Sequence, residues 1–330
     1  MRIAIVRLSA MGDIIQSMIV LQFIKCYYPN AQIDWFVDSS FAQILEHNPD
    51  IFQIHEVNFK DIKKTKSFLK LLKILKKIRE LKEYDYVFDL QGLLKSAIIT
   101  KVINSKHKIG FDKNSLREPI ASIFYNRKYT FDYGENVVLR NLFLIEQTLN
   151  IKHFSLENKK PFLFFKKNSP KVKISNYAVI VIGASFSAKI YPLENFKKVI
   201  DFLECKCILV WGNKQEKLLA QTLERKSPKA LMAPKLSLNE LKQLIANSNI
   251  VLGGDTGPTH MAWALNIPSI TLFGPTPHWR NAYKTKINST LSSGSIIDIY
   301  NINKKDGSIK DINPQDIADL ANAILMEKEK

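Results

Sequence analysis

The stretch VLGGDTGPTH at residues 251–260 carries an apolar strand, a glycine-containing turn and the start of a helix in immediate succession. Gly254 and Gly257 have no side chains, so the backbone at these positions can approach a ligand closely. The free N–H groups of the helix start, together with the helix dipole, form a binding site for an anion such as a diphosphate. The alternative is an ordinary strand–turn–helix unit capped by Asp255 or Thr256.

Outward from this stretch, the whole chain alternates short apolar runs with helical patterns. In the first half, apolar runs at 2–7, 33–37, 53–57, 85–89 and 108–111 alternate with helical patterns at 14–27, 41–47, 62–81, 93–103, 118–124 and 135–149. In the second half, runs at 177–182, 206–211, 230–233, 250–252 and 269–273 alternate with helices at 193–202, 215–226, 238–247 and 259–265. This order predicts an α/β protein of two doubly wound, Rossmann-like domains, with the active site in the cleft between them.

A polar, lysine-rich stretch separates the two halves. We predict an N-terminal domain over 1–160, a linker over 161–175, a C-terminal domain over 176–312 and a final helix over 313–330. The length of 330 residues suits two domains of ordinary size. Asn313 and Pro314 supply a cap and a first-turn proline for the final helix, which we expect to pack back toward the N-terminal domain.

The charge balance is strongly basic. The chain has 48 lysines and arginines against 31 acidic residues, a formal net charge of +17. Such an excess favours anionic partners: nucleic acid, an acidic membrane surface or phosphorylated substrates. The alternative is that lysine serves simply as a solvating residue. Residues 60–82 hold ten of these cations between apolar residues at helical spacing, which predicts either a solvated surface helix or one beside anionic lipid or a phosphorylated acceptor.

Several classes of protein lack support in the sequence. Three cysteines, Cys26, Cys205 and Cys207, have neither disulfide nor metal-site spacing and fit a reducing cytosol. No apolar run approaches the ~20 residues of a membrane helix, so we expect a soluble or peripheral protein. Neither a D-x-D triplet nor an H-E-x-x-H motif occurs, so no metal is expected to be obligatory, and a stimulatory divalent ion stays open.

In the first half, the turn after the first strand offers a carboxylate at a helix start. Asp13 is predicted to be a general base that takes a proton from an acceptor hydroxyl; the alternative is a helix cap. The absence of a G-x-G-x-x-G fingerprint argues against a dehydrogenase or epimerase. Polar and basic residues near strand ends are predicted to bind an anionic acceptor: Ser9, Lys95, Arg117, Arg127 and Arg140.

In the second half, Lys189 follows the first strand. An ammonium group beside a leaving diphosphate would stabilise the charge that develops there; the alternative is a solvated surface lysine. Glu216, after the next strand, can accept hydrogen bonds from ribose hydroxyls. The residues predicted to bind the donor are Ser185, Lys189, Glu216, Asp255, Thr256, Gly257, Pro258, Thr259 and His260, with Asp13 and Lys189 predicted to be catalytic.

Eight motifs along the chain resemble one enzyme family. They are RLSAMGD at 7–13, DLQGLLKS at 89–96, REPIASIFYNRK at 117–128, KIYP at 189–192, WG at 211–212, PKLSL at 234–238, GDTGPTH at 254–260 and LFGPT at 272–276. Essentially the whole chain resembles the ADP-heptose lipopolysaccharide heptosyltransferases, glycosyltransferase family nine, which have the GT-B fold. The stretch 117–128 favours type I over type II members.

The resemblance implies inverting transfer of L-glycero-D-manno-heptose from ADP-heptose to the first Kdo of Kdo2-lipid A in inner-core biosynthesis. It implies a cytoplasmic enzyme, peripheral on the anionic inner-membrane surface. Asp13 resembles the family's base, Lys189 its donor-phosphate lysine and Glu216 its ribose-binding acid. Alternatives are a type II enzyme, another ADP-sugar transferase, or a nucleic-acid-binding protein; since no nucleic-acid motif accompanies the charge, no nucleic-acid partner is expected.

Overall fold

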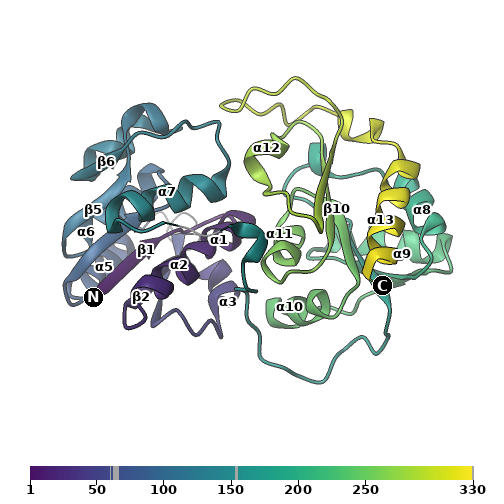
Figure 1. The fold of residues 1–330 in the computed structure, drawn as a ribbon, viewed down its shortest axis with the longest axis horizontal. Coiled ribbons are helices and arrows are strands. Elements are labelled where there is room, and N and C mark those ends of the chain that lie inside the picture. Colours follow the sequence, from purple (N-terminus) through teal and green to yellow (C-terminus); the bar gives the residue numbers. More distant parts are fainter. Residues whose placement is uncertain (60, 62–66, 153–154, 329–330) are drawn as a thin grey trace. The chain divides into compact units, whose positions relative to one another are not determined.

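The computed structural model describes residues 1–59, 61, 67–152 and 155–328. The chain divides into two compact units, Met1–Asn158 and Lys159–Lys330, and each contains one six-stranded parallel sheet with helices around it (Figure 1). The prediction of two Rossmann-like α/β domains is confirmed.

The first unit has the strand order β3-β2-β1-β4-β5-β6. All neighbouring strands pair in parallel. The chain order reverses between β1 and β4, and ligands of doubly wound sheets bind at the carboxyl ends of the strands at such a switch point. The strands are β1 (Arg2–Val6), β2 (Gln32–Asp38), β3 (Gln53–Val57), β4 (Tyr84–Asp89), β5 (Ser105–Phe111) and β6 (Arg127–Tyr129).

The helices of the first unit follow the predicted order with three differences. The helix predicted over 14–27 is two helices that meet at Met18, the start of the helix predicted over 62–81 lies outside the described residues, and the segment predicted at 118–124 is a 3-10 helix. The main elements are α1 (Met11–Ser17), α2 (Ile19–Tyr27), α3 (Ala42–Leu45), α5 (Phe68–Arg79), α6 (Leu94–Val102), η3 (Pro119–Phe124) and α7 (Val137–Leu149).

The second unit has the strand order β12-β11-β10-β7-β8-β9, with its switch point between β7 and β10. Its strands are β7 (Tyr177–Val181), β8 (Lys206–Val210), β9 (Ala230–Met232), β10 (Ile250–Gly254), β11 (Ser269–Phe273) and β12 (Asn288–Ser292). Its helices are α8 (Leu193–Phe202), α9 (Lys214–Lys226), α10 (Leu238–Ala246), α11 (Gly257–Ala264), α12 (His278–Asn281) and α13 (Pro314–Lys328).

Two strands, β6 and β12, have no counterpart among the predicted strands. Both lie at the edge of their sheets, where a strand has only one neighbour. An edge strand needs less apolar surface than a central one, so the polar sequences RKY and NSTLS suffice there. The apolar pattern that reveals a central strand is therefore missing from both.

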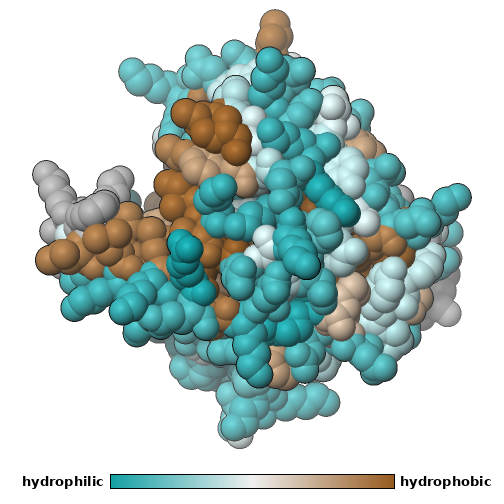
Figure 2. Space-filling model, turned by 90° about the vertical axis from the view of Figure 1, so that its left-hand side faces the viewer, coloured by the Kyte–Doolittle hydropathy of each residue, from teal (hydrophilic) through white to brown (hydrophobic). Residues whose placement is uncertain are grey.

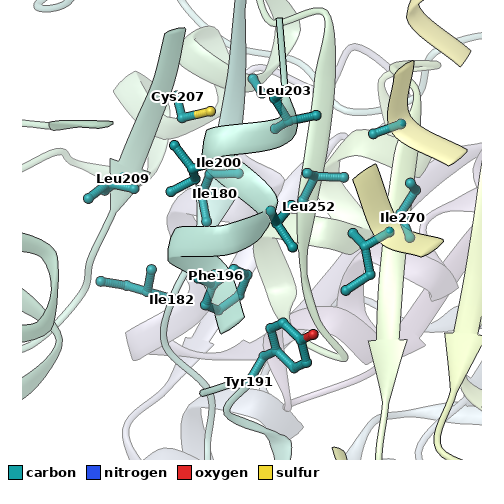
Figure 3. Close-up of a cluster of buried hydrophobic side chains, with 14 of the residues drawn as sticks. Ile180, Ile182, Tyr191, Phe196, Ile200, Leu203, Cys207, Leu209, Leu252 and Ile270 are labelled. Atoms are coloured by element: carbon teal, nitrogen blue, oxygen red, sulfur yellow. The ribbon is translucent and has the colours of Figure 1, made fainter. Parts of the chain in front are cut away.

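The core of the second unit explains why its central strands are continuous apolar runs. Ile270, Leu252, Ile180 and Leu209 come from four adjacent strands, and Figure 3 shows them in one cluster with Phe196 and Ile200 of α8. Each of these side chains is almost completely buried, which contributes roughly 1.5–3 kcal/mol per side chain. A parallel sheet covered by helices on both faces requires such residues on both sides of each strand.

The segment predicted as a linker, 161–175, is hydrogen-bonded to the second unit. The N–H of Phe162 donates to the carbonyl of Ala264 (3.0 Å), and Lys166 exchanges two hydrogen bonds with the side-chain amide of Asn239. The division between the units falls after Asn158, close to the predicted end of the first domain at 160. The segment therefore packs as part of the second unit.

The C-terminal helix α13 packs within the second unit. Ile317 and Ala321 lie in the core of that unit, where α13 packs against α8. These two residues are four apart and so share one face of the helix. The amide of Asn322 adds a hydrogen bond to the carbonyl of Phe202 (3.2 Å).

Candidate active site

Asp13 lies in the first turn of α1, beyond the carboxyl end of β1. Its Oδ1 is 3.1 Å from the guanidinium of Arg7, and its Oδ2 accepts a hydrogen bond from the N–H of Ala10 (3.1 Å). The Asp13 side chain is 41% exposed, so the carboxylate is held by its neighbours and still open to solvent. A positioned, accessible carboxylate can accept a proton from a bound hydroxyl.

Arg7 had no role in the sequence analysis beyond its place in the RLSAMGD motif. Its side chain is only 9% exposed, and its guanidinium also donates to the carbonyl of Leu90, in the loop after β4. Arg7 therefore ties Asp13 to the neighbouring strand end. The available signal was a charged residue directly after a buried apolar strand, a position where a charge needs a partner.

Ser9 and Lys95 also meet at this edge of the sheet. The ammonium of Lys95 lies 2.6 Å from the hydroxyl of Ser9, and the side-chain amide of Gln91 donates to the same hydroxyl (3.3 Å). Gln91 also accepts the N–H of Leu8 (2.8 Å). The loop after β4 thus organises the loop after β1, and three predicted residues, Ser9, Asp13 and Lys95, are brought together.

The surroundings of Lys95 lower the pKa of its ammonium group. Burial lowers the pKa of Lys95, and the nearby cation of Arg7 acts in the same direction. The carboxylates of Asp38, Glu118 and Asp13 partly oppose this shift. Charges of both signs are therefore concentrated around one lysine.

Asp89, the last residue of β4, holds the loop after that strand in place. Its Oδ1 accepts the N–H groups of Gln91 and Gly92 (2.9 Å each), and its Oδ2 accepts the hydroxyl of Tyr125 (2.8 Å). Burial raises the pKa of Asp89 in spite of these hydrogen bonds. Gly92 has a positive φ of 68°, which favours glycine at this turn.

The three arginines predicted to bind the acceptor have different surroundings. Arg117 is exposed, next to Glu118, whose carboxylate accepts the N–H of Leu94 at the start of α6 (2.7 Å). Arg127 lies on the edge strand β6, three strand spacings or ~14 Å across the sheet from β1. The structure therefore places Arg117 beside the start of α6, whereas Arg127 lies away from the residues at the end of β1.

Arg140 requires a correction. It is 5% exposed, and its guanidinium donates to the backbone carbonyls of Ser115 (2.7 Å), Phe131 (2.8 Å) and Asp132. Its guanidinium carbon also lies 4.2 Å from the ring centroid of Phe111. Arg140 holds loops of the first unit together and does not face outward as an acceptor contact would.

In the second unit, the predicted donor residues converge on the carboxylate of Asp255. The ammonium of Lys189 lies 2.6 Å from Oδ2, and Nε2 of His260 lies 3.0 Å from Oδ1. The side-chain amide of Asn281, on α12, donates to Oδ2 (3.1 Å). Asn281 is a residue that the sequence analysis missed, since nothing in the local pattern connects α12 with the loop before α11.

The charge state of Asp255 follows from these neighbours. Burial acts to raise the pKa of Asp255, but the cation of Lys189 and the hydrogen bond from His260 outweigh it and hold the pKa well below its usual value. Asp255 is therefore a buried carboxylate that stays ionised and orients three hydrogen-bonding side chains.

Lys189 is not a solvated surface lysine. Its side chain is only 14% exposed, and its ammonium lies 5.2 Å from the ring centroid of Phe186. The backbone carbonyl of Lys189 packs against Gly254 so closely that a Cβ at Gly254 would overlap it. Glycine at position 254 therefore allows the Lys189 turn and the α11 turn to meet.

The start of α11 is a capped turn that follows β10 directly. Gly257 and Pro258 form its first turn, and the hydroxyl of Thr259 accepts the N–H of Thr256 (3.3 Å) and bonds the carbonyl of Thr256 (2.7 Å). The hydroxyl of Thr256 is buried and has no hydrogen-bond partner among residues 1–59, 61, 67–152 and 155–328.

Glu216 lies in the first turn of α9, after β8. Its carboxylate accepts the N–H of Gly212 (2.6 Å) and the side-chain amide of Asn213 (2.7 Å). A Cβ at Gly183, after β7, would overlap this carboxylate, so glycine there lets the two strand ends approach. Ser185 is exposed in the same loop as Gly183.

Two further properties concern the described residues alone. They include no group of three or more histidine, cysteine, aspartate or glutamate side chains arranged to hold a metal ion. None of their helices is both long enough and apolar enough to cross a bilayer.

A sequence model of glycosyltransferase family 9 (heptosyltransferase) matches residues 71–296, more than half of the chain. The chain therefore belongs to this family and is a glycosyltransferase.

Individual relatives agree with the family match. The chain is 40% identical to lipopolysaccharide heptosyltransferase 1 of Campylobacter coli, over 98% of the chain and 99% of that protein. It is 30% identical to lipopolysaccharide heptosyltransferase 1 of Escherichia coli (strain K12), over 84% of the chain and 88% of that protein. The predicted resemblance to type I members of the family is confirmed.

Solved structures agree as well. The structure of the E. coli heptosyltransferase WaaC with ADP is 25% identical and has a TM-score of 0.76, covering 99% of this chain and 100% of that one. A family 9 glycosyltransferase from Veillonella parvula DSM 2008 has a TM-score of 0.82 at 19% identity, covering 99% of this chain and 97% of that one, and it shows the fold alone.

Proposed function

We propose that this enzyme transfers L-glycero-D-manno-heptose from ADP-heptose to the first Kdo of Kdo2-lipid A, with inversion at the anomeric carbon. Relatives named lipopolysaccharide heptosyltransferase 1 support heptose transfer in inner-core biosynthesis. A similar structure that contains ADP supports an ADP-linked donor. The cytoplasmic face of the inner membrane is the proposed place of the reaction, because the acceptor is a lipid.

The observation that carries the proposal is the cluster around Asp255. A buried, ionised carboxylate holds the ammonium of Lys189 and the ring of His260 beside the first turn of α11. The N–H groups of a helix start bind phosphate oxygens, and fixed cationic donors strengthen that binding. Donors held in place before the ligand arrives need no reorganisation during the reaction.

The mechanism is one in-line displacement. A Kdo hydroxyl oxygen forms a bond with the anomeric carbon of heptose while its proton passes to Asp13. The bond from that carbon to the diphosphate breaks, and its electron pair leaves with ADP, whose charge is stabilised by Lys189 and the start of α11. Glu216 binds the ribose hydroxyls. No step requires a metal ion, although a divalent ion could add to phosphate binding.

The direct test is transfer from ADP-heptose to purified Kdo2-lipid A, followed by mass spectrometry. The expected product is the acceptor with one added heptose. Product only on an acceptor that already carries one heptose would assign the enzyme to type II. Product only with a different ADP-sugar would show that this other sugar nucleotide is the donor.

The matched control is Asp13→Asn. We expect it to lose ~10²-fold or more in kcat while it binds ADP-heptose like the unmodified enzyme, because Asp13 contacts the acceptor proton and not the nucleotide. Near-normal turnover by Asp13→Asn would remove Asp13 from the role of base.

A further inference from the structure

Exposed lysines are common in this chain, so exposure alone does not mark a lysine as functional. The chain has 48 lysines and arginines, and hydrophilic side chains, teal in Figure 2, cover most of the face drawn there. A lysine that the fold holds beside a binding cluster differs from these, because its charge is already in place when a ligand arrives. Lys304, in the loop after β12, is such a residue.

The loop after β12, residues 294–307, has both of its ends fixed (yellow-green, at the top of Figure 1). The hydroxyl of Ser293 lies 2.9 Å from the hydroxyl of Ser295 and 2.9 Å from that of Ser308, so the two ends of the loop meet. The N–H of Ser293 also donates to the carbonyl of Phe273, at the end of β11 (2.9 Å). Surface loops whose ends are close in this way are compact and frequently functional. We call residues 294–307 the Lys304 loop.

The Lys304 loop is attached at its end to the turn that carries the donor lysine. The short helix η6 (Ser308–Asp311) follows the loop and packs against η5 (Ser187–Lys189). A Cβ at Gly274 would lie 3.0 Å from the carbonyl oxygen of Ala188 and 2.9 Å from the Cβ of Ile309, so glycine there lets the two turns approach. Ile309 is also part of the core of the second unit. The base of the loop therefore has a fixed position relative to η5.

Lys304 lies against the same aromatic ring as Lys189. The ammonium of Lys304 is 6.0 Å from the ring centroid of Phe186, and the ammonium of Lys189 is 5.2 Å from that centroid. The face of an aromatic ring attracts a cation at such distances. Phe186 is half-buried, and it holds the end of a lysine side chain that would otherwise be flexible. One ring therefore has two ammonium groups beside it.

The charges of the donor cluster favour a further cation. Lys189 and Asp255 form a close ion pair (2.6 Å), so their charges largely cancel at a distance. A diphosphate carries more than one negative charge, and a complementary site needs a net positive charge. Within the part of the chain that the structure describes, Lys304 forms no ion pair. The acidic residues of its loop, Asp298 and Asp306, accept N–H groups of nearby backbone instead (2.9 Å and 2.7 Å).

We propose that Lys304 binds the diphosphate of the donor as a second cation beside Lys189, and that Phe186 holds it in position. The inference rests on the proposed function, because the ADP-linked donor is taken from it. The ammonium of Lys304 is exposed, so water and salt screen its charge. Lys304 therefore contributes to donor affinity, whereas the breaking of the bond to heptose depends on the buried Lys189.

The test is calorimetric titration of the full chain with ADP and with adenosine. Lys304→Gln should bind ADP about 10-fold more weakly, because a hydrogen bond between charged groups is lost. It should bind adenosine like the wild type, since adenosine has no phosphate. Lys304→Arg keeps a cation that also packs on an aromatic ring and should recover most of the affinity for ADP.

The matched control is Lys305→Gln. It removes the same charge from the neighbouring exposed residue, and it should leave ADP affinity within about twofold of the wild type, because exposed charges at a distance contribute little. In the transfer assay, Lys304→Gln should raise the KM for ADP-heptose about 10-fold and leave kcat nearly unchanged, as expected for a contact that binds substrate and transition state equally.

A double-mutant cycle tests the role of the ring. Phe186→Leu keeps an apolar side chain and removes the aromatic face. If the ring holds Lys304, the double variant Phe186→Leu, Lys304→Gln should lose less ADP affinity than the product of the two single losses. Single losses that simply multiply would overturn the role of Phe186.

Three results would overturn the assignment of Lys304. They are unchanged ADP affinity in Lys304→Gln, an equal loss in Lys305→Gln, and an equal loss for adenosine. Circular dichroism melting of each variant would show that it is folded. Heptose transfer by the wild type, together with unchanged ADP affinity in Lys304→Gln, would reject Lys304 and keep the proposed function. Weaker ADP binding by Lys304→Gln, with no heptose transfer by the wild type, would keep Lys304 at a diphosphate site and reject the proposed function.

Discussion

The guanidinium of Arg7 lies 3.1 Å from the carboxylate of Asp13 and also donates to the carbonyl of Leu90. A buried arginine thus connects the proposed base with the loop of the neighbouring strand. Asp13 itself is 41% exposed, so without Arg7 only the N–H of Ala10 would hold its carboxylate in place. Arg7 is therefore a positioning residue for Asp13.

Replacing Arg7 tests this role. Arg7→Gln should lower kcat about 10-fold or more and leave the affinity for ADP-heptose unchanged, because the change disturbs the base and not the donor loop. Arg7→Lys keeps the charge and should recover part of the rate. Steady-state kinetics with calorimetric measurement of donor binding would separate the two quantities. If both variants lose kcat equally and both also bind ADP-heptose more weakly, the change would indicate a general folding defect.

Replacing Lys189 should affect binding and stability together. Lys189→Ala should weaken ADP binding ~10- to 100-fold, since hydrogen bonds to charged groups contribute about 1.5–3 kcal/mol. It should also lower the free energy of unfolding by about 3 kcal/mol, because Asp255 loses its cation. Asn281→Ala removes a neutral partner of the same carboxylate and should cost about 1 kcal/mol. Calorimetry and urea unfolding provide both measurements; wild-type ADP affinity in Lys189→Ala would contradict a donor-phosphate role.

The ionised Asp255 should make stability depend on pH in acid. The pKa of Asp255 is held below its usual value in the folded chain, so its ionisation stabilises the fold above the unfolded pKa of about 3.9 and this contribution is lost as pH falls further. The difference in unfolding free energy between wild type and Asp255→Asn should be constant from about pH 7 to pH 5 and shrink below about pH 4. A difference that does not change with pH would mean that Asp255 is not ionised in the fold.

Two arginines from the predicted acceptor set should behave oppositely. Arg140→Met leaves buried backbone carbonyls without donors and should cost about 2–3 kcal/mol of stability. Arg117→Met should change stability by no more than about 0.5 kcal/mol, because Arg117 is exposed, and should raise the KM for Kdo2-lipid A. Thermal unfolding and acceptor kinetics on the same two variants check both outcomes. A stable Arg140→Met with a raised KM would restore Arg140 to the acceptor site.

Local sequence was enough to predict those elements whose signal lies within one strand, turn and helix. The stretch 251–260 predicted β10, its turn and α11, because an apolar run, two glycines and a helix start each have a local physical cause. The central strands could be predicted for the same reason. The edge strands β6 and β12 could not, because their pairing comes from the neighbouring strand and not from their own composition.

The expectation that the active site lies between the two domains stays a prediction, as do the individual roles of Asp13, Glu216 and Arg127. The motifs of the family could be found in the sequence because they carry their own glycines and charges. The residues that contact those motifs from elsewhere in the chain could not be found in this way. Asn281 lies on a short helix with no periodic pattern, and its contact with Asp255 spans 26 residues.

The stretch 251–260 by itself determined that a glycine-rich turn opens a helix in this chain, and it predicted an anion site there. The tertiary structure decided which side chains meet at that turn. Lys189 and Asp255 are 66 residues apart in the chain and meet because β7 and β10 are adjacent in the sheet. It also decided that Arg7 holds Asp13 while Arg140 is buried. Composition reveals how many charges a chain has, but only packing determines which of them are buried and must be paired.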